Sequence, residues 1–170
     1  MDELIKKKLA RNWFKTLQEV ICQEIEELEG KKNIFKIKNW ERGKKSNEGG
    51  GQFRILENGK IFEKVGVNFS EVYGKFSKKF RNRIPGGEKN PKFWASGISI
   101  VMHMQNPHIP AMHFNTRYIC TKRNWFGGGM DVTPAIKDKN EQNNFHKKLK
   151  LMCDQPVSYT HLTLPTILLV

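Results

Sequence analysis

The chain has 170 residues, a formal net charge of +13, and 28% charged residues. This length can bury the core of one domain, and the charged fraction does not indicate disorder. No apolar run reaches the roughly 18 residues that a membrane-spanning helix needs, and the N-terminus lacks the apolar core of a signal peptide. Three cysteines, Cys22, Cys120 and Cys153, lie far apart, as is typical of a reducing compartment. We therefore expect a cytoplasmic protein.

The basic charge leaves two interpretations open. Lysines occur along most of the chain, and they are densest between Lys75 and Lys92. Such a distribution is more typical of a solvated surface than of a nucleic-acid interface. The same charge would also attract a small polycarboxylate.

Residues 2–29 are predicted to form one amphipathic helix. Asp2 can cap its start, and Gly30 can end it. Apolar residues recur at spacings of three and four, which predicts that one stripe faces the core. The stripe consists of Leu9, Trp13, Leu17, Val20, Ile21 and Leu28.

The segments after this helix have the patterns of strands and turns. Alternation over residues 34–40 predicts a strand, and Gly49, Gly50 and Gly51 are predicted to lie in a turn. Asn58-Gly59 between two apolar runs predicts a type I′ hairpin, in which both central residues have positive φ. A further strand is expected around residues 67–72, and residues 74–92 are expected to form a basic loop.

The window from Phe93 to Thr116 contains no charged residue, although it holds three histidines. One strand is predicted before residues 106–110 and a second strand after them. If they pair as a hairpin, alternation places one set of polar side chains on a single face. The set is Ser99, His103, His113, Asn115 and Arg117, and the opposite face is aliphatic and aromatic.

Arg117 and the histidines suggest two kinds of chemistry. An arginine on an otherwise uncharged sheet is costly unless it is paired, so its partner is either an internal acid, for which Asp131 is a candidate, or a substrate carboxylate. Two histidines on facing strands could hold a metal with a third ligand, but no carboxylate or cysteine lies close by in sequence. Gly127 to Gly129 would allow a flat ligand or a strand to approach closely.

The C-terminal part is predicted to contain a helix over about residues 140–153. The last 16 residues carry no charge and differ in composition from the chain before them. They fit either a buried strand or sequence foreign to this protein, and we favour the second. The expected division is thus residues 1–154, the N-terminal part of a single domain, and a tail of doubtful origin at 155–170.

Three long motifs resemble oxygen-dependent coproporphyrinogen III oxidase: GGGQFRILENGKIFEKVGVNFSEVYG, ASGISIVMHMQNPHIPAMHFNTRY and WFGGGMDVTP. The resemblance covers about Leu4 to Asp154. It implies an α+β fold with a large antiparallel sheet flanked by helices, incomplete in this chain. It also implies oxidative decarboxylation of two propionates of coproporphyrinogen III to vinyl groups, using O2 as co-substrate and no required cofactor, by a cytoplasmic homodimer.

The resemblance also assigns residues. It implies His113, Asp131 and Arg117 as catalytic residues, and substrate contacts by Ser99, Asn115, Thr116 and Arg117. A divalent metal would be held by His103, His113 and His146. Because family members are nearly twice as long, alternatives are an inactive truncated remnant or a partner subunit. A basic β-sheet module that binds single-stranded nucleic acid would instead show aromatics interleaved with Lys and Arg on one face.

Overall fold

The computed structural model describes residues 2–30, 34–43, 48–88 and 90–154. These residues form three helices and six strands. In chain order they are α1 (Glu3–Leu28), β1 (Lys36–Glu41), β2 (Gly49–Glu57), β3 (Phe62–Lys75), α2 (Lys78–Arg81), β4 (Lys92–Met104), β5 (Ala111–Cys120), β6 (Asn124–Thr133) and α3 (Lys139–Asp154). The chain divides into two compact units, residues 1–135 and residues 136–170. All six strands belong to the first unit, and α3 belongs to the second.

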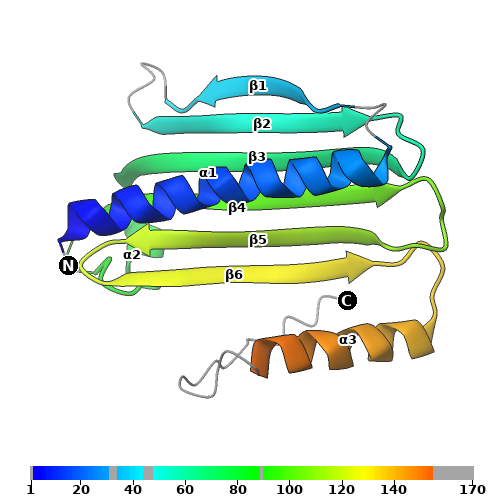
Figure 1. Cartoon of the computed structure of the whole chain (residues 1–170). Helices are drawn as coiled ribbons and strands as arrows, with labels where there is room; N and C mark the ends of the chain where they lie inside the picture. The colour runs from blue at the N-terminus through cyan, green and yellow to red at the C-terminus, as the bar shows by residue number, and fades with distance from the viewer. Residues whose placement is uncertain (1, 31–33, 44–47, 89, 155–170) are drawn as a thin grey trace. The chain divides into compact units, whose positions relative to one another are not determined.

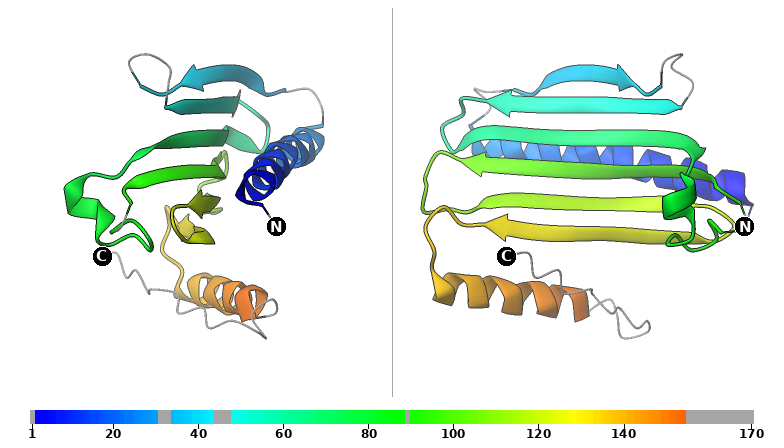
Figure 2. Two further views of the ribbon diagram at one scale, coloured as in Figure 1. Left: turned by 90° about the vertical axis from the view of Figure 1, so that its left-hand side faces the viewer. Right: turned by 180° about the vertical axis from the view of Figure 1, so that it is seen from behind.

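The strands form one antiparallel sheet whose spatial order, β1 to β6, equals their order in the chain (Figure 1). Each strand therefore pairs with its neighbours in sequence, which confirms the predicted α+β class. Helix α1 lies along one face of the sheet, and α2 projects on the other side (Figure 2). We call the face turned away from α1 the far face. No described helix is long and apolar enough to cross a membrane.

Helix α1 begins and ends as predicted. The side chain of Asp2 accepts a hydrogen bond from the backbone N–H of Leu4 at 3.3 Å. Gly30 follows the helix with a φ of +76°, the left-handed conformation that ends many helices.

The predicted apolar stripe of α1 is correct for Leu17 and Ile21 but wrong for its other four residues. Leu9, Trp13 and Val20 are 55%, 58% and 46% exposed, and Leu28 is exposed as well. The buried positions are Ala10, Phe14, Gln18, Cys22 and Ile25, with Leu17 and Ile21 packed beside them. A hydropathy pattern assigns Gln18 to the polar side, so most of the stripe is predicted on the wrong face.

Gln18 is buried because the sheet satisfies its amide. Its Nε2 donates to the carbonyl oxygens of Gln52 and Val67, both at 2.9 Å. A polar side chain that forms its hydrogen bonds can be buried at little cost. Around it, α1 packs on a core formed by Leu56, Phe62, Val65, Val67, Phe69, Ile98, Ile100, Tyr118 and Cys120.

The predicted turn at Gly49–Gly51 is also wrong, because these glycines open β2. The backbone of β3 approaches them closely: a Cβ on Gly51 would lie 2.0 Å from the carbonyl oxygen of Phe69. The strand therefore requires glycine at this position. The separate strand expected near residues 67–72 is the second half of a single long β3.

The hairpin between β2 and β3 is present, but its turn is not the predicted type I′. Asn58 has a φ of +59°, whereas Gly59 does not have a positive φ. Glu29, at the end of α1, binds the backbone that follows the turn. Its carboxylate accepts the backbone N–H groups of Lys60, Ile61 and Phe62 at 2.5, 2.9 and 2.8 Å.

The other hairpin predictions hold. β4 and β5 pair across residues 105–110, and α3 covers the predicted C-terminal helix. The tail at 155–170 lies outside the described residues, and the predicted division at residue 154 stays a prediction.

Candidate functional site

Polar side chains of β3 to β6 lie in rows across the far face. The strand register sets three of them: Gly66, Val101, His113 and Asp131; Asn68, Ser99, Asn115 and Gly129; and Ser70, Gly97, Arg117 and Gly127. His103 lies one position beyond the first row, opposite Lys64. The hairpin thus brings Ser99, His103, His113, Asn115 and Arg117 to one face, as predicted from alternation.

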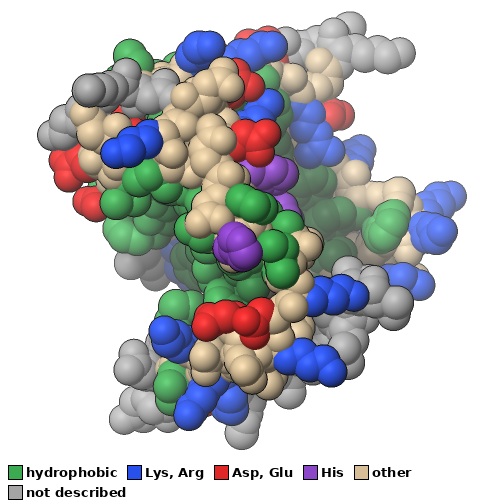
Figure 3. All heavy atoms as spheres, turned by 90° about the vertical axis from the view of Figure 1, so that its right-hand side faces the viewer, with side chains coloured by type: hydrophobic (Ala, Val, Ile, Leu, Met, Phe, Trp, Pro, Cys, Tyr) green, Lys and Arg blue, Asp and Glu red, His purple; other side chains and the backbone are tan. Residues whose placement is uncertain are grey.

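His113 and Asp131 form a cross-strand pair. The distance from His113 Nδ1 to Asp131 Oδ2 is 3.9 Å, within reach of an ion pair but beyond a hydrogen bond. Thr133 Oγ1 donates to the same carboxylate oxygen at 3.3 Å. The ring of His103 lies edge-on to that of His113 with centroids 6.4 Å apart. Histidine side chains therefore gather at the end of the sheet where β4 turns into β5 (Figure 3).

Arg117 is exposed and lies between two glycines. Its cross-strand neighbours are Gly97 on β4 and Gly127 on β6. A Cβ on Gly97 would lie 2.5 Å from the carbonyl oxygen of Thr116 and 2.7 Å from the Cβ of Arg117, so the close approach of β5 requires glycine there. The Nη2 of Arg117 donates to Asn115 Oδ1 at 2.9 Å. The remaining N–H groups of the guanidinium are thus available to a ligand.

The suggested pairing of Arg117 with Asp131 is wrong. Asp131 lies opposite His113, four residues along β6 from the position opposite Arg117. At about 3.3 Å per residue, the two positions are about 13 Å apart along the sheet. Asp131 therefore faces His113, and Arg117 has room to bind the carboxylate of a ligand.

The two buried cysteines on the α1 side do not contribute a nucleophile. Burial raises the pKa of the Cys22 thiol to about 11, although the nearby Arg54 opposes the shift. Burial also raises the pKa of the Cys120 thiol. Both thiols stay protonated at neutral pH, and a protonated thiol is a poor nucleophile.

Comparison with known proteins places the chain in a family. Residues 9–163 match the family model described as coproporphyrinogen III oxidase. The chain belongs to the coproporphyrinogen III oxidase family.

Curated relatives named oxygen-dependent coproporphyrinogen-III oxidase agree with this assignment. Those of Rickettsia rickettsii (strain Sheila Smith) and Rickettsia akari (strain Hartford) are 47% and 46% identical over 157 residues. That of Rickettsia typhi (strain ATCC VR-144 / Wilmington) is 47% identical over 153 residues. Each alignment covers 88% of this chain and 55% of the relative. The chain spans about half the length of the curated relatives it matches.

Two of the residues assigned by resemblance to this oxidase family are not among the polar side chains of the far face. Thr116 pairs with Ile98 and Gly128, so its side chain is on the α1 side of the sheet, opposite Asn115 and Arg117. His146 lies on α3, in the second unit.

The suggested metal stays a prediction. Within residues 2–30, 34–43, 48–88 and 90–154, no group of three His, Cys, Asp or Glu side chains that could hold an ion is found. In the first unit His103 and His113 supply two nitrogen donors, and structural or catalytic metal sites need at least three protein ligands; the suggested third, His146, belongs to the second unit.

Sequence reasoning missed two polar residues of the far face, Asn68 and Ser70 on β3. Asn68 lies opposite Ser99, and its Oδ1 accepts the indole N–H of Trp40 at 2.8 Å. Their alternation with the buried Val67 and Phe69 was the signal that could have found them. Aromatic residues also occupy this face, contrary to the expectation that they lie only opposite the polar set: Trp40, Phe53, Phe93 and Trp125.

Proposed function

We propose that the protein acts on coproporphyrinogen III, as a cytoplasmic oxidase that converts two propionate side chains to vinyl groups with O2. The observation that carries the proposal is the far face of the oxidase-family sheet. It presents an exposed arginine flanked by glycines and, about 13 Å away, an Asp–His pair. Oxygen is the co-substrate, no further cofactor is required, and the working form is a homodimer.

The chemistry sets what the site must do. Each propionate loses CO2 and the equivalent of one hydride, which leaves a vinyl group; O2 takes up the hydride and one proton to become hydrogen peroxide. The reaction therefore needs a group that holds a carboxylate, a group that accepts a pyrrole N–H, and a group that moves a proton.

Arg117 is suited to the first role. A guanidinium binds a carboxylate through two parallel N–H···O bonds, and only one Arg117 nitrogen donates to Asn115. Gly97 and Gly127 leave space beside it for a propionate chain. Ser99 and Asn115, in the next row, can donate hydrogen bonds to the same ligand.

Asp131 and His113 are suited to the other two roles, accepting a pyrrole N–H and moving a proton. An ionised Asp131 accepts a pyrrole N–H and stabilises positive charge on an oxidised ring, and His113 beside it carries the proton. Their separation of 3.9 Å allows a proton to pass after a small movement.

The test is an assay of oxygen-dependent protoporphyrinogen formation by the chain and by Asp131→Asn, followed by fluorescence after oxidation to protoporphyrin. Asp131→Asn keeps the shape of the side chain but removes the charge, so we expect turnover to fall at least about a hundredfold, the usual contribution of an acid–base group. Glu24→Gln, an exposed change on α1, is the matched control. Near-normal turnover of Asp131→Asn would overturn its role.

A second candidate function is binding of the tetrapyrrole without turnover, as a non-catalytic partner subunit. The exposed Arg117, of which one nitrogen donates to Asn115, supports carboxylate binding in either case. Binding of coproporphyrin without turnover supports this second function, and absence of both binding and turnover contradicts both.

A further inference from the structure

The loop between β3 and β4 is strongly basic. Residues 75–92 contain a single acid, Glu88, among seven cationic residues: Lys75, Lys78, Lys79, Arg81, Arg83, Lys89 and Lys92. The turn between β5 and β6 adds Lys122 and Arg123. We call the described cationic residues of these two segments the basic cluster.

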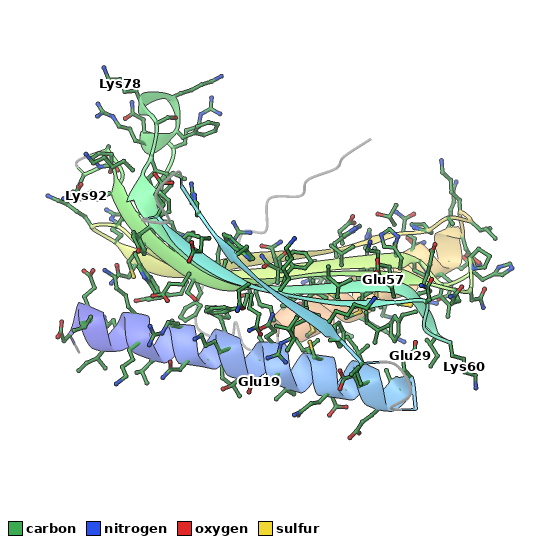
Figure 4. All side chains as sticks on the ribbon, turned by 90° about the horizontal axis from the view of Figure 1, so that it is seen from above. Glu19, Glu29, Glu57, Lys60, Lys78 and Lys92 are labelled. Atoms are coloured by element: carbon green, nitrogen blue, oxygen red, sulfur yellow. The ribbon has the colours of Figure 1, made fainter. Side chains whose placement is uncertain are left out.

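Side-chain contacts fix this loop at one end of the sheet. Phe76 stacks on Phe93, with ring centroids 4.4 Å apart. Thr121 Oγ1 donates to the carbonyl oxygen of Pro85 at 2.7 Å, which joins the loop to the β5–β6 turn. Lys78 lies on the side of the sheet away from α1, at the opposite end from Lys60 (Figure 4), whereas Lys92, next to the far-face residue Phe93 on β4, is at the same end but faces the α1 side. The basic cluster therefore borders the far face.

The cluster is not neutralised by acids. Among the residues described in the structure, no carboxylate lies within ion-pair distance of its Lys and Arg side chains, whereas Arg42 and Lys64 pair with Glu48 and Glu57. The Nε of Arg81 is also buried without a hydrogen-bond partner in the described structure. Gathered like charges raise the local potential and favour a bound anion.

Arg117 lies between the cluster and the His113–Asp131 pair. It precedes the end of β5 by three residues, about 10 Å along the strand. A ligand whose carboxylate binds Arg117 can thus extend one way to the Asp–His pair and the other way to the cluster. On β4 and β5 the window from Phe93 to Thr116 has no cation, although Lys64 on β3 lies opposite His103 at the other end of the face.

We propose that the basic cluster binds the carboxylates of the tetrapyrrole that point away from the Asp–His pair. This inference rests on the proposed function and adds to it the residues that recognise the remote propionates. A compact polycarboxylate fits this arrangement better than single-stranded nucleic acid, which needs a continuous track of cations along its backbone.

The experiment is a fluorescence titration of the 170-residue chain with coproporphyrin III, a stable tetracarboxylate, and with mesoporphyrin IX, which has two carboxylates. Lys78→Glu is compared with Lys60→Glu, because both lower the net charge equally at opposite ends of the sheet. At low salt we expect Lys78→Glu to weaken coproporphyrin binding about threefold to tenfold, as for the loss of one or two exposed charge contacts. Lys60→Glu should change it less than about twofold, and the difference should shrink above about 0.3 M salt.

Each outcome decides one point. If Lys78→Glu and Lys60→Glu weaken coproporphyrin binding equally, the proposal for the basic cluster is wrong and the proposed function stands. The same holds if Lys78→Glu weakens mesoporphyrin binding as much as coproporphyrin binding. Failure of the folded unaltered chain to bind coproporphyrin overturns both. If a single-stranded oligonucleotide binds more tightly than coproporphyrin, and Lys78→Glu weakens it more than Lys60→Glu does, the ligand class is nucleic acid and the proposal is wrong. Thermal unfolding of both variants shows whether each remains folded.

Discussion

Replacing Glu29 by alanine should destabilise the protein more than any change at an exposed acid of α1. The Glu29 residue is 6% exposed, and its carboxylate accepts three backbone N–H groups of the β2–β3 turn. Hydrogen bonds to a charged group contribute about 1.5–3 kcal/mol each, but they are not additive and the desolvation of the carboxylate opposes them. We expect Glu29→Ala to lower the free energy of unfolding by about 2–4 kcal/mol, because the buried N–H of Phe62 and the part-buried N–H groups of Lys60 and Ile61 lose their acceptor.

The same contact predicts how stability depends on pH. Burial alone would raise the pKa of Glu29, but the backbone N–H groups of Phe62, Ile61 and Lys60 outweigh it and hold the pKa below its ordinary value. A carboxyl group whose pKa is lower in the folded state stabilises the fold fully above its unfolded pKa, about 4.3 for glutamate. The contribution is lost as pH falls through the lower, folded pKa. The stability difference between the unaltered chain and Glu29→Gln should therefore be constant near neutral pH and shrink below about pH 4.

The measurement is urea unfolding followed by circular dichroism, at several pH values, for the unaltered chain, Glu29→Ala and Glu29→Gln. Glu24→Ala is the control, since Glu24 is an exposed residue of the same helix. The reasoning is refuted if Glu29→Ala costs no more than Glu24→Ala, or if the Glu29→Gln difference grows as the pH is lowered.

Two further changes test the packing that supports the site. Gln18→Leu should cost about 2–3 kcal/mol of unfolding free energy, because the carbonyl oxygens of Gln52 and Val67 lose a buried donor; a neutral effect in urea unfolding would contradict this. Gly51→Ala should cost more than about 2 kcal/mol, since its Cβ would overlap the carbonyl oxygen of Phe69. Gly127→Ala is the matched control, because its Cβ would meet its nearest atom, Trp125 Nε1, at an ordinary 3.8 Å. Equal melting temperatures for the two variants would contradict the prediction, because they would show that β3 can move away from the added Cβ of residue 51.

Much of the far face was predictable because a strand has a period of two and a short turn fixes the register. The charge-free window and the turn at residues 105–110 were sufficient to bring Ser99, Asn115 and Arg117 to one face. Asn68 and Ser70 have the same alternation but were missed, because only the turn and the apolar residues of β3 were used to predict that strand.

The errors have a common physical origin: in each, a polar or glycine residue serves a distant backbone. Gln18 is buried because it binds carbonyl oxygens of β2 and β3, which hydropathy cannot show. Gly51 is required by the approach of Phe69 from the next strand. After the turn at Asn58-Gly59, the N–H groups of residues 60–62 bind the carboxylate of Glu29, 31 to 33 residues earlier in the chain, which a local turn motif cannot show.

The position of Arg117 follows from the same register and bears on function. Asp131 lies four residues along β6 from the position opposite Arg117, too far for an ion pair. The residues directly opposite Arg117 are glycines, so no acid faces the arginine across the strands. Its Asn115 contact leaves the positive charge uncompensated, and the nearby basic cluster adds charge of the same sign. A sheet face that presents Arg117 about 13 Å from Asp131 is arranged for a ligand that carries negative charge at its rim and N–H donors within it. This is the distribution of charge in a porphyrinogen with propionate side chains.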